Sequence, residues 1–322
     1  MKRCGSLFLL AFGLAFGAVQ TAGAEDLFVT QYKNDPSGAP YAVALEKGFF
    51  KKHGVDITGI VAGAGGGSSV RGAMATAIGY GDVSPAPAIA AIVQGQDIKI
   101  TNLTSGAIAM SMVVMPNSSI KTPKDLKGKK IGISNPKSLG EMMSVLVMES
   151  AGLKSGDTQM VALGSLSGAL TALESGAVDA TSIPVILYRM RHGDTKYRAI
   201  MEAKDLPKLP SQLGIATGKA IKEHPDKIRA IQAARIEGTK FIYEHTDEAI
   251  AILSKVYAPL PADQVAGMVK DLVAMKYWTD GPLDEALLET TVRVMKSVQM
   301  LDKDVDVKSL YTSALLPANL QK

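Results

Sequence analysis

The stretch VDITGIVAGAGGGSSVRGAMAT, residues 55–76, decides the fold of this chain. Its apolar, β-branched beginning over residues 55–61 predicts a strand. The glycines and serines of residues 63–69 predict a tight turn, and residues 70–76 predict a helix. A strand, a glycine-rich turn and a helix in this order are typical of an α/β sheet.

The residues at the start of that helix are suited to binding a small anion. Helix N-termini carry partial positive charge and unpaired N–H groups, so Asp or Glu usually occupies the first turn. Here the first turn carries Arg71 and small residues that let a ligand approach the backbone. The pattern predicts a small-anion site at Gly66, Gly67, Ser68, Ser69 and Arg71. The alternative is a turn that needs glycine for its backbone angles, with serine caps and an arginine pointing to water.

The N-terminus predicts export. Lys2 and Arg3 precede an apolar run over residues 7–19 and small residues at 21–24. This is the pattern of a secretory signal peptide, cut near Ala24. The apolar run is shorter than the roughly 20 residues that span a bilayer. We therefore expect a periplasmic protein that is not inserted in the membrane.

The composition of the remaining chain excludes several classes of function. Cleavage removes Cys4, the only cysteine, so neither a disulfide nor thiol chemistry is expected. It also leaves 33 Lys and Arg against 31 Asp and Glu. So small a net charge excludes strong binding to nucleic acid or to a membrane surface.

Strands and helices alternate in two successive units. Strands are predicted over residues 27–30, 55–61, 77–83 and 98–104, and then over 111–115, 131–134, 159–163 and 178–183, with helices between them, including a continuous helix over 40–52. A returning strand over 213–217 precedes four amphipathic helices, over 225–245, 247–257, 262–274 and 283–300. This alternation predicts parallel α/β sheets.

The two units contain a weak internal repeat. Residues 72–83 and 168–179 each read as a short helix, a glycine and a strand with an aspartate near its start. Two similar α/β units that face each other place their turns on one cleft, because ligands of such sheets bind at the carboxyl ends of the strands. Two lobes around a cleft suggest hinge closure on a ligand.

Four segments carry a resemblance to a known family. They are ALEKGFFKKHGVDI (44–57), AIGYGDVS (77–84), KTPKDLKGKKIG (121–132) and LESGAVDA (173–180). In this order, behind a signal peptide, the chain resembles the substrate-binding proteins of ABC importers for nitrate, sulfonates and taurine, a group that includes relatives of thiamine-precursor binding proteins.

The resemblance implies a periplasmic-binding-protein fold of type II, with two α/β lobes, two crossover strands and a cleft between the lobes. It implies a first lobe of residues 25–111 and 207–322 and a second lobe of residues 112–206. The implied ligand contacts lie in turns at strand ends: Gln31, Tyr32, Lys33, Asn34, Gly66, Gly67, Ser68, Ser69, Arg71, Ser84, Pro85, Thr104, Ser105, Asn135, Ser138, Leu139, Gly140, Ile183 and Pro184.

These candidates have structural alternatives. Ser138 and Glu141 form a capping box, which alone explains the serine. Arg71 or Lys33 would supply a counter-charge, but either side chain can lie on the surface. The five lysines over residues 121–130 form a solvated face or a docking patch for the permease. Candidate walls for an apolar ligand tail are Tyr32, Tyr41, Tyr188 and Trp278.

The function implied is that of a monomeric protein, without a cofactor or metal, that captures a small solute and presents it to a membrane permease. The order of expected solutes is alkane sulfonate or taurine, then a carboxylate, nitrate, and a neutral pyrimidine. One alternative is a sensor that presents the solute to a membrane receptor. Another is an enzyme or binding protein for a thiamine pyrimidine precursor. The enzyme's cysteine-rich motif is absent, and the four histidines lack metal-ligand spacing.

Overall fold

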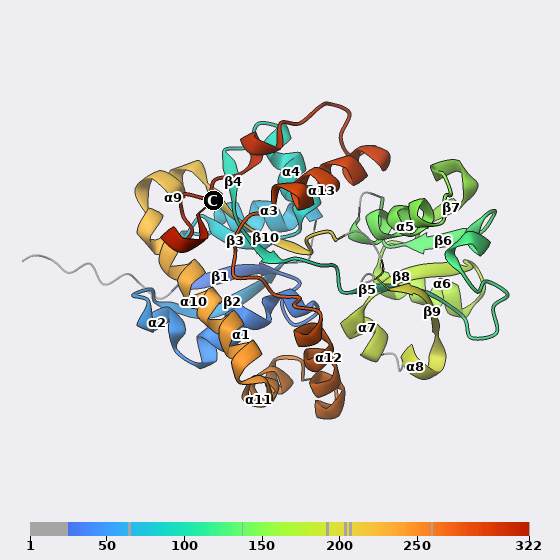
Figure 1. The fold of residues 1–322 in the computed structure, drawn as a ribbon, viewed down its shortest axis with the longest axis horizontal. Coiled ribbons are helices and arrows are strands. Elements are labelled where there is room, and N and C mark those ends of the chain that lie inside the picture. The colour runs from blue at the N-terminus through green and yellow to red at the C-terminus, as the bar shows by residue number, and fades with distance from the viewer. Residues whose placement is uncertain are drawn as a thin grey trace, which may run out of the picture.

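The chain folds into two α/β lobes, each built on a five-stranded sheet (Figure 1). The computed structural model describes residues 25–63, 66–136, 138–190, 193–202, 205, 208–258 and 260–321; the predicted signal peptide lies outside them. The first sheet has the order β2 (Ile57–Gly63), β1 (Glu25–Thr30), β3 (Tyr80–Val83), β10 (Gln212–Thr217), β4 (Ile98–Ser105). The second has the order β7 (Gln159–Ala162), β6 (Lys130–Ile133), β8 (Ala180–Pro184), β5 (Met110–Val114), β9 (Arg198–Glu202).

Both sheets are mixed, so the prediction of parallel sheets is wrong for one strand in each. β10 runs antiparallel to β3 and β4, and β5 runs antiparallel to β8 and β9. These two strands follow the crossings between lobes. Each of these strands enters its lobe at the cleft and runs away from the cleft. The neighbouring strands run toward the cleft and end at it, so the direction is antiparallel. The two-lobe fold with two crossover strands is confirmed.

The helices cover the faces of the sheets. The helices of ten or more residues are α3 (Gly66–Ala75), α5 (Leu139–Ser150), α10 (Pro225–Glu244), α11 (Thr246–Val256), α12 (Ala262–Ala274) and α13 (Glu285–Ser297). The shorter ones are α1 (Ala39–Glu46), α2 (Phe49–Lys52), α4 (Pro85–Val93), α6 (Leu166–Glu174), α7 (Val185–Met190), α8 (Gly193–Lys196) and α9 (Gly218–Glu223). Figure 1 shows α10 and α11 beside α1 at the first lobe, with α12 next to α11.

The continuous helix predicted over residues 40–52 is broken. Gly48 has φ +71°, a left-handed conformation that ends α1 and starts α2. The prediction also missed α7, α8, α9 and β9, which have only four to six residues each. A helix of four to six residues is too short to show a hydrophobic period.

The lobes also meet away from the crossover strands. Helix α13 packs against α4 in the first lobe and α5 in the second. The Arg293 guanidinium lies 2.9 Å from the Glu149 carboxylate of α5, and both side chains are exposed. The predicted lobe boundary at residues 111 and 112 falls inside β5, and the predicted boundary at 206 and 207 lies outside the described residues. Both remain predictions.

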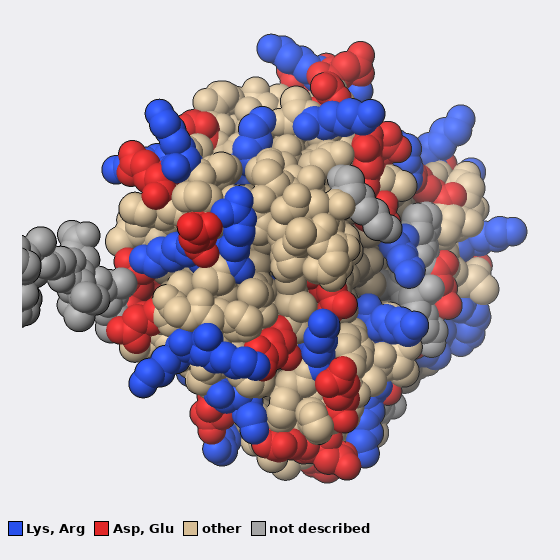
Figure 2. All heavy atoms as spheres, turned by 60° about the vertical axis from the view of Figure 1, so that its left-hand side comes forward, with Lys and Arg blue, Asp and Glu red and all other residues tan. Residues whose placement is uncertain are grey.

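Charges of both signs are interspersed over the face of the first lobe in Figure 2, as expected from the nearly balanced composition. In the second lobe, four of the five lysines over residues 121–130 are exposed. The Lys127 ammonium lies 3.7 Å from the Asp157 carboxylate. Among the described residues, no helix is long and apolar enough to cross a membrane.

A buried arginine holds the first lobe together behind the cleft. Arg235 of α10 is only 1% exposed, and its guanidinium donates hydrogen bonds to the Thr104 carbonyl at the end of β4 and to the Thr279 carbonyl, the latter at 2.6 Å. It therefore ties the segment before α13 to the sheet. Its charge also acts on Asp82 of β3, which is fully buried.

Replacing this arginine by a methionine of similar length should destabilise the protein strongly. Arg235→Met leaves the Thr279 carbonyl without a donor among the described residues, the Thr104 carbonyl with only the Thr279 N–H at 3.3 Å, and the buried Asp82 carboxyl without its counter-charge. We therefore expect the free energy of unfolding to fall by about 3–5 kcal/mol. Unfolding in urea, followed by circular dichroism, measures this change.

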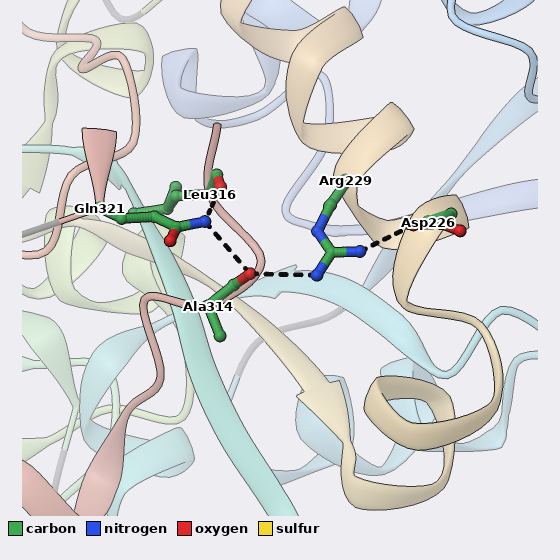
Figure 3. A network of polar contacts seen from close by, with 5 residues as sticks. All are labelled: Asp226, Arg229, Ala314, Leu316 and Gln321. Carbon is green, nitrogen blue, oxygen red and sulfur yellow. Dashed lines mark hydrogen bonds and ion pairs between the residues drawn. The ribbon is translucent and has the colours of Figure 1, made fainter. Parts of the chain in front are cut away.

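Arg229→Met on the same helix is the matched control. Arg229 lies 2.7 Å from Asp226 and donates to the Ala314 carbonyl at 3.3 Å, in an exposed network (Figure 3). Its loss should change the free energy of unfolding by less than about 1 kcal/mol. Equal effects of the two substitutions would contradict the role given to Arg235.

The Asp82 carboxyl is an unusual buried group. Neither of its oxygens has a hydrogen-bond partner among the described residues. Burial raises its pKa to about 7, and the charge of Arg235 and the hydroxyls of Thr104 and Tyr41 offset only part of that rise. The folded protein therefore holds the Asp82 proton more tightly than the unfolded chain does.

This difference makes stability depend on pH. The contribution of protonated Asp82 is fully present below about pH 4 and is lost as the pH rises through about 7. Relative to Asp82→Asn, the wild-type free energy of unfolding should fall by about 2–4 kcal/mol over that range. Urea unfolding at intervals between pH 4 and 8 compares the two proteins; parallel curves would refute the assignment.

Candidate functional site

A cavity of about 280 Å³ lies between the two lobes. The first lobe and the return crossing contribute Gln31, Asp35, Ser84, Pro85, Ala86, Pro87, Ser211 and Gln212. The second lobe contributes Met110, Ser134, Asn135, Pro136, Ser138, Leu139, Gly140, Met142, Leu166 and Pro184.

Strand ends place these residues around the cavity. Gln31 follows β1, Ser84 follows β3, Ser134 follows β6, and Pro184 ends β8. Gln212 starts β10, which begins where its neighbours end. The carboxyl ends of neighbouring parallel strands share an edge of the sheet, and in both lobes that edge faces the other lobe.

The N-terminus of α5 supplies free hydrogen-bond donors. The Ser138 hydroxyl caps the helix by accepting a hydrogen bond from the Glu141 N–H at 3.2 Å. The N–H groups of Leu139 and Gly140, one residue and two residues past the cap, have no acceptor among the described residues. Both residues line the cavity, so the positive end of the α5 dipole opens into it.

The facing helix α4 is a poorer donor. Ser84 is its N-cap residue, and Pro85 and Pro87 in the first turn have no N–H group. The Ala88 N–H already bonds the Ser84 carbonyl at 3.4 Å. Ala86 therefore offers the one free N–H of this turn, and the proline rings present an apolar surface.

The first lobe also presents hydrogen-bond acceptors. Asp35 is 8% exposed, and burial raises the pKa of its carboxyl despite hydrogen bonds from the Ser37 backbone and hydroxyl. The Gln212 N–H donates to the Ser105 hydroxyl at 2.9 Å, while its side-chain oxygen Oε1 is buried without a donor. None of the described residues that line the cavity is Lys or Arg.

Eight of the predicted contact residues line the cavity: Gln31, Ser84, Pro85, Asn135, Ser138, Leu139, Gly140 and Pro184. The structure brings these turns of both lobes together. A ligand contact for each of them stays a prediction.

The other predicted residues lie outside the cavity lining. Tyr32, Ser69, Thr104, Ser105 and Ile183 are buried, whereas Lys33, Asn34, Gly67, Ser68 and Arg71 are exposed. Gly66 begins α3. Ile183 is buried because successive side chains of a strand point to opposite faces of the sheet. Pro184 lines the cavity, so the side chain of Ile183 before it lies in the core.

The proposed aromatic walls belong to the cores. Tyr41 is fully buried in the first lobe, and the Trp278 indole donates to the Pro36 carbonyl at 2.9 Å. Tyr188 packs against Tyr197 in the second lobe, with ring centroids 6.4 Å apart. The described lining of the cavity is aliphatic and polar instead.

Sequence reasoning missed several lining residues: Asp35, Ser134, Met110, Met142, Leu166, Ser211 and Gln212. Asp35 lies within the predicted polar turn after the first strand, so the turn itself was a signal. Gln212 immediately precedes the predicted returning strand, and only its antiparallel direction places it at the cleft. The two methionines read as ordinary core residues.

A metal centre is not indicated by the side chains. Within the described ranges, no group of three or more His, Cys, Asp or Glu side chains is arranged to hold a metal ion.

Comparisons with known proteins agree with this geometry. A family model described as NMT1/THI5 like matches residues 35–249. A protein of Bacillus subtilis (strain 168) named for binding aliphatic sulfonates is 27% identical over 299 residues, covering 88% of this chain and 86% of that protein.

Two solved structures share the fold. The periplasmic aliphatic sulphonate-binding protein SsuA from Escherichia coli has a TM-score of 0.75 at 22% identity, covering 89% of this chain and 92% of that chain. SsuA from Methylobacillus flagellatus KT, described as the periplasmic sulfonate-binding protein of a sulfonate ABC transporter, has a TM-score of 0.70 at 18% identity, covering 91% and 92%. With its motifs, two-lobed fold and family match in agreement, the chain belongs to the NMT1/THI5-like family and has the fold of its periplasmic sulfonate-binding relatives.

Proposed function

We propose that this protein is the solute-binding component of an ABC importer, which captures a small organic anion between its lobes and delivers it to a membrane permease. The observation that carries the proposal is the cavity between the lobes, into which the free N–H groups of Leu139 and Gly140 open. The relatives described as sulfonate-binding proteins support it.

The cavity matches the chemistry of an alkane sulfonate or carboxylate. An anionic head accepts hydrogen bonds from the first turn of α5, with help from the helix dipole. Met110, Met142 and Leu166 provide an apolar surface for a short alkyl chain. The volume of about 280 Å³ lies just below the range of pockets for drug-sized ligands, so it suits a small solute.

The proposal includes where the protein works. The N-terminal sequence supports export to the periplasm with cleavage near Ala24, and the mature protein acts there as a monomer that meets the permease. It acts by binding rather than by catalysis, since no step of bond making is required for capture and release.

A solute screen tests the proposed function directly. The protein without residues 1–24, stripped of ligand, is heated with alkane sulfonates, short carboxylates, nitrate or pyrimidines. A solute present at about 100 times its dissociation constant should add about 2.7 kcal/mol to the free energy of unfolding and raise the midpoint. Stabilisation by a neutral pyrimidine alone would contradict the anion, and no stabilisation by any of these solutes would contradict the proposal.

Leu139→Pro removes one proposed donor without disturbing the helix. Residue 139 is the first position of α5, where proline is well tolerated, and the extended backbone of Ser138 (φ −90°, ψ 162°) suits a residue before proline. The loss of a hydrogen bond to a charged group should weaken anion binding by about 1.5–3 kcal/mol. Calorimetric titration measures it.

Leu139→Ala is the matched control, because it shortens the side chain and keeps the N–H group. The proline variant should bind the anion more weakly than the alanine variant, at equal thermal stability. Equal affinities for the two variants would mean that the Leu139 N–H does not contact the solute.

A further inference from the structure

One ionisable side chain lies on the wall of the cavity. Among the described residues that line it, Asp35 is the only Asp, Glu, Lys, Arg or His. The proposed place of the anion is the start of α5, where Leu139 and Gly140 open into the same space of about 280 Å³. Two negative charges in a space of this size repel each other strongly, because protein screens them much less than water does.

The Asp35 carboxyl is largely removed from water. Burial raises its pKa. Hydrogen bonds from the Ser37 N–H, at 2.9 Å, and from the Ser37 and Tyr277 hydroxyls lower the pKa, but by less than burial raises it. Burial disfavours the charged form of a carboxyl, so this group takes up a proton more readily than an exposed aspartate does.

The groups that face Asp35 from the first lobe are hydroxyls and a second carboxyl. The Asp35 charge raises the pKa of three of them, the Tyr257 and Tyr277 hydroxyls and the Asp82 carboxyl. Of the cations in this region, Arg235 donates to backbone carbonyls behind the cavity, and Lys33 is exposed. These groups do not neutralise the carboxylate.

The described residues of the second lobe add a negative charge on the other side. Glu141 lies in the first turn of α5, directly after Gly140, and does not line the cavity. The donors of α5 that face the solute are backbone N–H groups, which carry only the partial charge of a helix dipole. An anion bound there leaves the charge of Asp35 uncompensated.

We propose that the anion binds together with a proton, which the Asp35 carboxyl takes up from the solvent. This rests on the proposed function and adds the proton to what the cavity captures. The proton attaches to Oδ2, since Oδ1 accepts the hydrogen bonds from Ser37. The neutral carboxyl no longer repels the anion, and it gains an O–H donor.

The pH dependence of binding follows from this coupling. The bound anion raises the pKa of Asp35 further, so the affinity is highest at low pH, where the free protein already holds the proton. The affinity falls as the pH rises from the pKa of the free protein to that of the complex. For one proton the fall reaches about tenfold per pH unit.

Calorimetric titration with ethanesulfonate and propanesulfonate between pH 5 and 8 tests the proposal. Both sulfonates stay ionised over this range, so a change in affinity comes from the protein. We expect the affinity to fall by about tenfold or more from pH 5 to pH 8. Where the affinity changes, adding the sulfonate to a lightly buffered solution of the protein should raise its pH.

Asp35→Asn identifies the group that takes up the proton. Asparagine keeps an oxygen that accepts from Ser37 but carries no charge at any pH. Its affinity for the sulfonate should not depend on pH, and at pH 8 it should exceed that of the wild type by about tenfold or more. A purely structural role for Asp35 predicts the opposite, namely weaker binding than the wild type at every pH.

Two further variants serve as controls. Asp82→Asn removes the neighbouring buried carboxyl, whose pKa is about 7 but which does not line the cavity, so most of the pH dependence should remain. Asp226→Asn removes an exposed carboxylate on α10 and should leave the dependence unchanged.

The outcomes separate this proposal from the proposed function. If the wild type binds equally well at pH 5 and pH 8, or if Asp35→Asn keeps the pH dependence, the proton uptake is wrong and the anion-binding function stands. Loss of the dependence in Asp82→Asn alone would also contradict the role of Asp35. If no anion binds at any pH, the proposed function fails and the proton uptake with it.

Discussion

The structure depends on one constraint, that strands from two separate sheets end on the same cavity. Each lobe is a strand–helix alternation whose strands finish at its inner edge, followed by the turns and helix starts that carry polar side chains. The crossover strands maintain this arrangement, because β5 and β10 begin at the edge where their neighbours end. Neither lobe alone provides both the donors at α5 and the acceptors at Asp35 and Gln212.

The first lobe keeps its shape behind the cleft through buried polar groups rather than apolar packing alone. Arg235 fastens the end of β4 to the segment before α13, and the Tyr80 hydroxyl donates to the Asn102 side chain at 3.1 Å. Such a network specifies one arrangement of the helices against the sheet. This network therefore holds in place the strand ends that line the cavity.

The sequence predicted most of the fold and part of the site. The alternation of strand and helix patterns located most strands to within a few residues. The sequence also predicted that the turns after β1, β3, β6 and β8 lie at one cleft. The break at Gly48 and the short helices α7 and α8 were not predicted, because neither one left-handed residue nor a helix of four to six residues leaves a periodic pattern. Gln212 was not predicted because its place at the cavity depends on the direction of β10. The cavity-lining methionines were not predicted because their place depends on how the two lobes pack across the cleft. The anion site predicted at the start of α3 is not part of the cavity lining, and Arg71 is exposed.

The ion pair between Arg293 and Glu149 has a consequence for the contact between the two lobes. It joins α13, packed on the first lobe, to α5 of the second, so separating the lobes at this edge breaks it. Both side chains are exposed, and such pairs contribute only about 0.2–1 kcal/mol. Dissolved salt screens them further. The contact between the lobes at this edge therefore weakens as the ionic strength of the surrounding medium rises.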